Sequence, residues 1–116
     1  MNTNLVGQDM ALRAMSTPDT YIKQQLEIWK RRRDLIYNGF TKLGLELWKP
    51  EGAFYVLPKI DKPREFVETL YLKYKTISYL GEWFGAPDRV RFSYAIEEEQ
   101  IKTGLDRIEQ CLMDIR

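Results

Sequence analysis

The sequence predicts an α/β fold: a small two-layer sandwich with helices packed on one face of a short mixed or antiparallel sheet. Apolar residues recur at helical spacings of three, four and seven near both ends of the chain, whereas the middle is rich in aromatic and β-branched residues between glycines and prolines. The length of 116 residues suits one domain with a single core.

The first part of the chain is predicted to be a lead-in followed by a long helix. Residues 1–16 have scattered apolar positions, so we expect a lead-in segment that can include a short helix, and residues 17–116 form the domain. A helix from about 19 to 43 fits Pro18 at its start and Gly44 after its last turn. Its continuous apolar face is formed by Ile22, Leu26, Trp29, Ile36, Phe40 and Leu43.

The middle of the chain is predicted to hold the first strands and a second helix. Residues 45–60 surround a Pro-Glu-Gly turn, which predicts two strands, or one strand after an extended lead, with Gly52 supplying the turn geometry. A helix begins at Pro63, and residues 76–80 form a short strand. The inner side of this helix is formed by Phe66, Val67, Leu70 and Tyr74.

The last third is predicted to be a loop, a strand and a helix. Residues 81–88 contain two glycines, a proline and an aspartate, which predicts a loop. In the strand at 89–95, one face carries Val90, Phe92 and Tyr94, and the other carries Arg89, Arg91 and Ser93. The helix from about 97 to 115 has an apolar stripe that includes Cys111. We expect this single cysteine to pack as a small hydrophobe in a reducing, cytoplasmic setting.

Composition excludes several classes of function. The 18 basic and 17 acidic residues give a net charge of +1, so we expect no nucleic-acid or membrane partner. The absence of histidine excludes His-based triads and the common zinc sites, and we expect no metal site. No apolar run approaches the roughly 20 residues of a membrane span, and no signal-peptide pattern opens the chain.

Three stretches contain candidate binding residues. Arg91 lies beside a Gly-rich aromatic loop and is suited to grip a carboxylate by two parallel hydrogen bonds, although a solvated or ion-paired surface arginine is the more frequent outcome for such a pattern. In "GEWFG", Trp83 and Phe84 either wall a pocket or fold into the core. In "EGAFY", Phe54 and Tyr55 take opposite faces of a strand, so we expect one ring to pack into the core. The other ring then lies on the outer face, where an exposed aromatic side chain calls for a functional explanation.

Two charge clusters favour structural roles. The "KRRRD" run at 30–34 is flanked by acids and predicts a solvated helix face rather than a phosphate site. The "EEE" run at 97–99 lies where the positive end of a helix dipole favours acidic residues. Paired carboxylates, metal-ligand clusters and phosphate-binding loops are absent, so the chain has no catalytic set of its own.

Four motifs occur in a specific order: "RRD" late in the long helix, "PEGAFY", "GEWFG" and "VRFSYA". Together they resemble the C-terminal portion of the class I/II pyridoxal-phosphate aminotransferases of fold type I, over nearly the whole chain. The resemblance implies a small domain that closes over a cofactor held by a large domain, with residues 1–16 as a remnant of the junction. It also implies amino transfer between an amino acid and a 2-oxo acid.

The resemblance also implies roles for individual residues. It assigns to Arg91 the binding of the substrate α-carboxylate. The residues expected to border the substrate entrance are Gly52, Phe54, Tyr55, Trp83 and Phe84. The loop departs from the family pattern, because Leu80 precedes its first glycine where a proline is more common, and Ile96 stands where a capping serine is common.

The family's catalytic groups have no match in this sequence. The Schiff-base lysine in its Ser-Lys or Ser-x-x-Lys stretch, the acid opposite the pyridinium nitrogen and the phosphate-binding residues lie on the family's large domain. We therefore expect this chain to bind no pyridoxal phosphate and to be inactive alone. We expect it to associate with the missing large domain and to form a homodimer or self-associate.

Two other functions are compatible with the sequence. A stand-alone regulatory module that binds an amino acid or carboxylate would need only Arg91 on an exposed sheet. An RNA-binding sheet would use the aromatic positions of "RVRFSYA" to stack bases, but the near-zero net charge counts against it.

Overall fold

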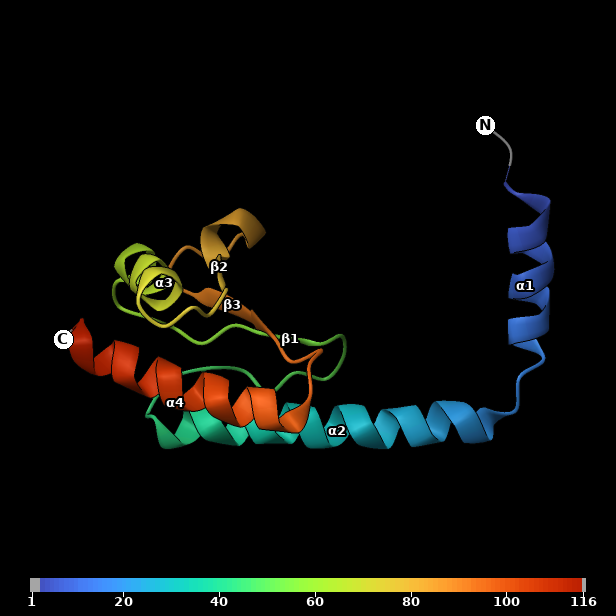
Figure 1. Cartoon of the computed structure of the whole chain (residues 1–116), viewed down its shortest axis with the longest axis horizontal. Coiled ribbons are helices and arrows are strands. Elements are labelled where there is room, and N and C mark those ends of the chain that lie inside the picture. The colour runs from blue at the N-terminus through green and yellow to red at the C-terminus, as the bar shows by residue number, and fades with distance from the viewer. Residues whose placement is uncertain (1–2, 116) are drawn as a thin grey trace.

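The computed structural model describes residues 3–115 and confirms the predicted fold class. Its elements, in chain order, are α1 (Leu5–Met15), α2 (Asp19–Lys42), β1 (Tyr55–Val56), α3 (Pro63–Leu72), β2 (Tyr79–Leu80), the 3₁₀ helix η1 (Gly81–Phe84), β3 (Val90–Ser93) and α4 (Glu98–Asp114). Within these residues the fold is α/β, with four α-helices and a three-stranded antiparallel sheet of order β1-β3-β2 (Figure 1).

The core lies between the helices and one face of the sheet. Phe92, on the central strand β3, has its ring centroid 5.2 Å from that of Phe40 on α2 and 6.3 Å from that of Phe66 on α3. Helix α4 runs beside the C-terminal half of α2 and closes this layer (Figure 1). Its Cys111 is fully buried, as predicted, and desolvation raises the pKa of the thiol to about 11.

The apolar face of α2 is buried only toward its C-terminal end. Ile36 and Phe40 are buried, whereas Ile22 and Leu26 are 52% and 51% exposed. The N-terminal half of the helix projects past the end of α4, and α1 lies beyond it without a buried residue (Figure 1). The periodic pattern therefore predicted the helix correctly, but it did not show which part of its apolar face the rest of the domain buries. None of the helices in residues 3–115 combines the length and apolar character needed to cross a membrane.

The turn before β1 differs from the sequence prediction. The residue with left-handed geometry is Ala53, at φ 56°, and not Gly52. Tyr94 explains this placement, because its hydroxyl donates a 3.0 Å hydrogen bond to the Ala53 carbonyl and its backbone N–H donates a 2.9 Å bond to the Phe54 carbonyl. The two bonds fix the two peptide groups that follow the Ala53 Cα and offset the cost of a positive φ at a residue with a Cβ.

The prediction that one ring of Phe54 and Tyr55 packs into the core is wrong. The two rings lie in contact, with centroids 4.5 Å apart, and Val56 is the residue that enters the core, with 1% of its surface exposed. The reason is that β1 begins only at Tyr55, so the alternation of a strand does not extend to Phe54.

Candidate functional site

The candidate site lies on the sheet face that points away from the helices. Because Tyr79 is opposite Arg91 and Tyr55 is opposite Ser93 in the strand register, these four side chains project from the same face. Antiparallel sheets commonly have one covered face and one open face, and the covered face here carries Val56, Val90 and Phe92.

Three aromatic rings surround the Arg91 guanidinium. Its Cζ atom lies 3.7 Å from the ring centroid of Phe84, 4.3 Å from that of Tyr55 and 5.2 Å from that of Tyr79. We call these three residues the aromatic cage. Cation–π contacts of this kind are worth roughly 0.5–2 kcal/mol each, depending on desolvation.

Arg91 has no acidic partner within the described part of the chain. No carboxylate of residues 3–115 lies within 4.0 Å of its nitrogens, and its Nε atom is buried without a hydrogen-bond partner. A charge that is partly desolvated and unpaired favours an incoming anion. The site can therefore accept a carboxylate by electrostatics and hydrogen bonding.

The η1 loop places Phe84 on Arg91. A Cβ at Gly81 would lie 2.2 Å from the Ala86 carbonyl oxygen and 2.5 Å from that of Arg89, so this position requires glycine. Gly85 ends the 3₁₀ turn at φ 79°. The loop is also tied to α3, since one guanidinium nitrogen of Arg64 contacts both carboxylate oxygens of Glu82 at 2.7 and 2.9 Å.

A groove of about 760 Å³ opens beside Arg91. Its lining includes Tyr79 and Ser93 near the arginine, and apolar side chains from Ile77, Ile96 and Leu105 along its length. The groove lies between helix α4 and the segment that leads into β2, and Arg91 is one of its lining residues.

The structure places two of the six predicted binding residues, Tyr55 and Phe84, against a third, Arg91. Trp83 is 63% exposed, and its ring centroid lies 6.2 Å from that of Tyr79. Phe54 packs against Trp29 of α2, with centroids 6.0 Å apart, and Gly52 sits in an exposed turn with no atom within 4 Å of the place where a Cβ would lie.

Sequence reasoning missed Tyr79, which completes the aromatic cage. Its role depends on the register that sets it opposite Arg91, and no local pattern encodes that register.

Arg89 has surroundings unlike those of Arg91. It is 4% exposed; its Nη2 lies 2.8 Å from Glu46 Oε1, and its Nη1 donates a 2.9 Å hydrogen bond to the Leu57 carbonyl. Its guanidinium also stacks on Trp48, with Cζ 3.8 Å from the ring centroid. Arg89 is therefore committed to holding the 46–57 segment against β3.

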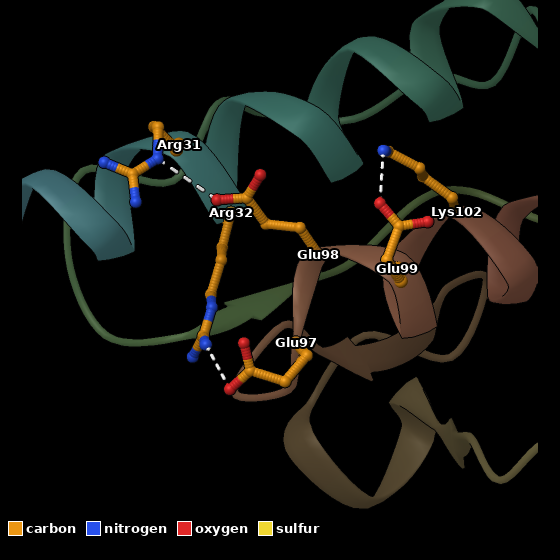
Figure 2. Close-up of polar contacts among 6 residues, drawn as sticks. All are labelled: Arg31, Arg32, Glu97, Glu98, Glu99 and Lys102. Atoms are coloured by element: carbon orange, nitrogen blue, oxygen red, sulfur yellow. Dashed lines mark hydrogen bonds and ion pairs between the residues drawn. The ribbon is translucent and has the colours of Figure 1, made fainter.

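The basic cluster at 30–34 joins α2 to the start of α4. Arg31 Nε lies 3.1 Å from Glu98 Oε1, and Arg32 Nη2 lies 2.7 Å from Glu97 Oε1. Both ion pairs are drawn as dashed lines in Figure 2. Glu97 also forms a capping box with Gln100. Arg32 departs from the predicted solvated face, because only 13% of its side chain is exposed. The acidic run thus has the structural role predicted for it and, in addition, neutralises these arginines.

Comparison with known proteins identifies the family. A profile of the family described as aminotransferase class I and II matches residues 1–108. The chain belongs to this family. A probable aspartate/prephenate aminotransferase from Aquifex aeolicus is 33% identical over 98% of this chain and 32% of its own length. A Thermus aquaticus protein described in the same way is 38% identical over 79% of this chain and 25% of its own length.

Solved aminotransferase structures share the fold. The aspartate aminotransferase from Thermotoga maritima superimposes with a TM-score of 0.86 at 32% identity, over 95% of this chain and 29% of that one. The aromatic aminotransferase from Pyrococcus horikoshii OT3 gives a TM-score of 0.76 at 27% identity, over 83% of this chain and 27% of that one. The chain thus spans less than a third of each of these aminotransferases.

Membership of this family implies pyridoxal phosphate as the cofactor of the complete enzyme. The described residues of this chain do not fit as its binding site. Every lysine is exposed, and hydrogen bonds from Lys73 to Asp114 and from Lys102 to Glu99 raise the pKa values of those two amines. A Schiff-base amine needs the opposite shift, toward the neutral form. Residues 3–115 also contain no group of side chains that could hold a metal ion.

Proposed function

We propose that this chain is the small, C-terminal domain of a pyridoxal-phosphate aminotransferase that moves an amino group between an amino acid and a 2-oxo acid. Within it, Arg91 binds the α-carboxylate of the substrate. The observation that carries the proposal is a guanidinium held by aromatic rings, without an acidic partner, on the open face of the sheet.

The contact between Arg91 and the carboxylate would position the substrate and would not itself break or form a covalent bond. Two parallel N–H···O bonds to a carboxylate fix both the place and the orientation of a substrate, and such fixing lowers the entropic part of the barrier. Arg91 would orient the amino acid while groups outside this chain perform the proton transfers. This division predicts that the chain is inactive alone.

Inactivity alone is tested by mixing the purified chain with pyridoxal phosphate and reducing with borohydride. We expect only scattered, substoichiometric labelling, since every lysine is exposed and the hydrogen bonds of Lys73 and Lys102 raise the pKa values of their amines. A stoichiometric adduct at one lysine, together with turnover of an amino acid, would contradict the proposal.

A second candidate is a stand-alone carboxylate-binding module. The observation that favours it is that the cage and the adjoining groove are both built within this chain. Calorimetry with a panel of amino acids and dicarboxylates separates the two candidates. Specific micromolar binding that Arg91→Ala abolishes favours the module, whereas an aminotransferase domain that holds one part of a larger site shows no specific micromolar binding.

We also propose that the isolated chain self-associates. Exposed apolar side chains gather on α1 and the first half of α2, and surface of this kind is normally covered by protein. They are Leu5, Val6, Met10, Leu12, Met15, Tyr21, Ile22 and Leu26. Sedimentation at high concentration tests the idea, and a clean monomer would count against it.

A further inference from the structure

We infer that the aromatic cage is a positioning device: Tyr55, Tyr79 and Phe84 hold the Arg91 guanidinium where another fold would use an acid, and so leave its charge free for an anion. This inference rests on the proposed carboxylate-binding role of Arg91. It adds a function for the three rings that is separate from any contact they make with substrate.

The need for such a device follows from the chemistry of arginine. A long side chain on an open sheet face samples many rotamers, and ordering it costs conformational entropy. A carboxylate partner would fix it but would also neutralise its charge and occupy its hydrogen-bonding fork. Aromatic rings attract a guanidinium through their quadrupole and leave both the charge and the fork available.

The contacts of Arg91 fit this role. The ring of Phe84 approaches from the η1 loop and that of Tyr55 from β1, at 3.7 and 4.3 Å, so the guanidinium is held from two separate elements. Of the three guanidinium nitrogens, Nε is the buried one that lacks a partner. The terminal nitrogens are therefore the ones available to a ligand, as a bidentate contact requires.

The loop that carries Phe84 is itself held in place. Gly81 packs so closely against the backbone of Ala86 and Arg89 that the loop cannot shift without breaking these contacts. Glu82 is the acidic residue of η1, and its carboxylate is engaged by Arg64 rather than by Arg91. The loop thus places the Phe84 ring against Arg91, while its own acid, Glu82, is paired with Arg64.

The cage is tested first without a ligand, by NMR of the Arg91 Nε–Hε group in the full 116-residue chain, assigned by its loss in Arg91→Ala. Ring currents should shift this proton upfield, and the buried Nε should exchange slowly with solvent. Phe84→Leu should reduce both effects. Trp48→Leu is the matched control, because it removes the ring on Arg89 and should leave the Arg91 signal unchanged.

The same samples are then titrated with sodium acetate. We expect acetate to bind Phe84→Leu about 3- to 10-fold more weakly than wild type, the effect of losing one cation–π contact, and to bind Trp48→Leu as wild type. Tyr79→Leu provides a second substitution in the cage at an exposed position, and its native fold is checked by the amide signals of β3.

The outcomes test the cage and the proposed carboxylate-binding function separately. An Arg91 signal that is the same in wild type and Phe84→Leu overturns the cage, and so does a changed signal with unchanged acetate affinity. A caged Arg91 signal that acetate does not perturb contradicts the proposed carboxylate-binding function and leaves the cage standing.

Discussion

Two arginines lie two positions apart on the same side of the chain around β3, and their surroundings differ in kind. Arg89 is buried against Trp48 and paired with Glu46. Arg91 is surrounded by aromatic rings, and no acidic residue in the part of the chain that the structure describes forms an ion pair with it. The difference teaches that an arginine in or beside a strand serves the fold when its charge is balanced and can serve a ligand when it is not.

The largest effect is expected at Gly81, because the η1 loop touches both arginine sites. Gly81→Ala forces a Cβ against two backbone carbonyls, and we expect the free energy of unfolding to fall by about 2–3 kcal/mol, as overpacking does. Urea denaturation measures the change.

Gly104→Ala is the matched control for Gly81→Ala. No atom lies within 4 Å of a Cβ at this position in α4, so this change should raise stability by about 0.5–1 kcal/mol through helix propensity. Equal stability of the two variants would show that the loop is free to adapt, and the contrast between the arginines would then not depend on it.

Arg89→Ala is expected to have the next largest effect. It leaves the Leu57 carbonyl without its donor and a space beneath Trp48, and we expect a loss of about 2 kcal/mol in the free energy of unfolding, less than for a fully buried pair because Glu46 is 67% exposed. A loss below about 0.5 kcal/mol would place Arg89 among ordinary surface residues and remove the contrast.

Arg91→Ala should change stability by less than about 1 kcal/mol in either direction. The variant loses cation–π contacts but also relieves a partly desolvated, unpaired charge. The same urea experiment reports the difference. A loss as large as that of Arg89→Ala would mean that Arg91 serves the fold.

The smallest effect is expected at the exposed pair between Arg64 and Glu82. Their side chains are 70% and 32% exposed, so Arg64→Ala should lower the free energy of unfolding by at most about 0.5 kcal/mol. The sharper readout is the Arg91 Nε–Hε signal, which should move because the pair helps to hold the loop that carries Phe84. An unmoved signal would show that Gly81 alone fixes the loop.

Local patterns predicted the helices and failed to distinguish the arginines. The long helix was predicted over 19–43 and observed at Asp19–Lys42, and the last over 97–115 and observed at Glu98–Asp114, since spacing and end residues encode both. Arg89 and Arg91 look alike in the sequence because Glu46, which separates their roles, lies 43 residues away from Arg89.

Long-range contacts also account for the other differences. Alanine took the left-handed position beside Gly52 because Tyr94, 41 residues away, holds its carbonyl. Arg31 is paired with Glu98 across 67 residues, and Tyr79 joins the cage through strand register alone. Such pairings depend on the tertiary fold, so they cannot be predicted from local propensity or periodicity.

The central claim is tested most directly by steady-state kinetics of the complete aminotransferase that carries this domain, with Arg91→Ala and Arg89→Ala compared at a temperature where both are folded. Losing one partner of a hydrogen-bonded charge pair predicts a fall in kcat/KM for the amino acid of at least about 100-fold in Arg91→Ala. Arg89→Ala should stay within about 3-fold of wild type, because its stacking and ion pair act on the fold. Wild-type kcat/KM in Arg91→Ala would contradict the account.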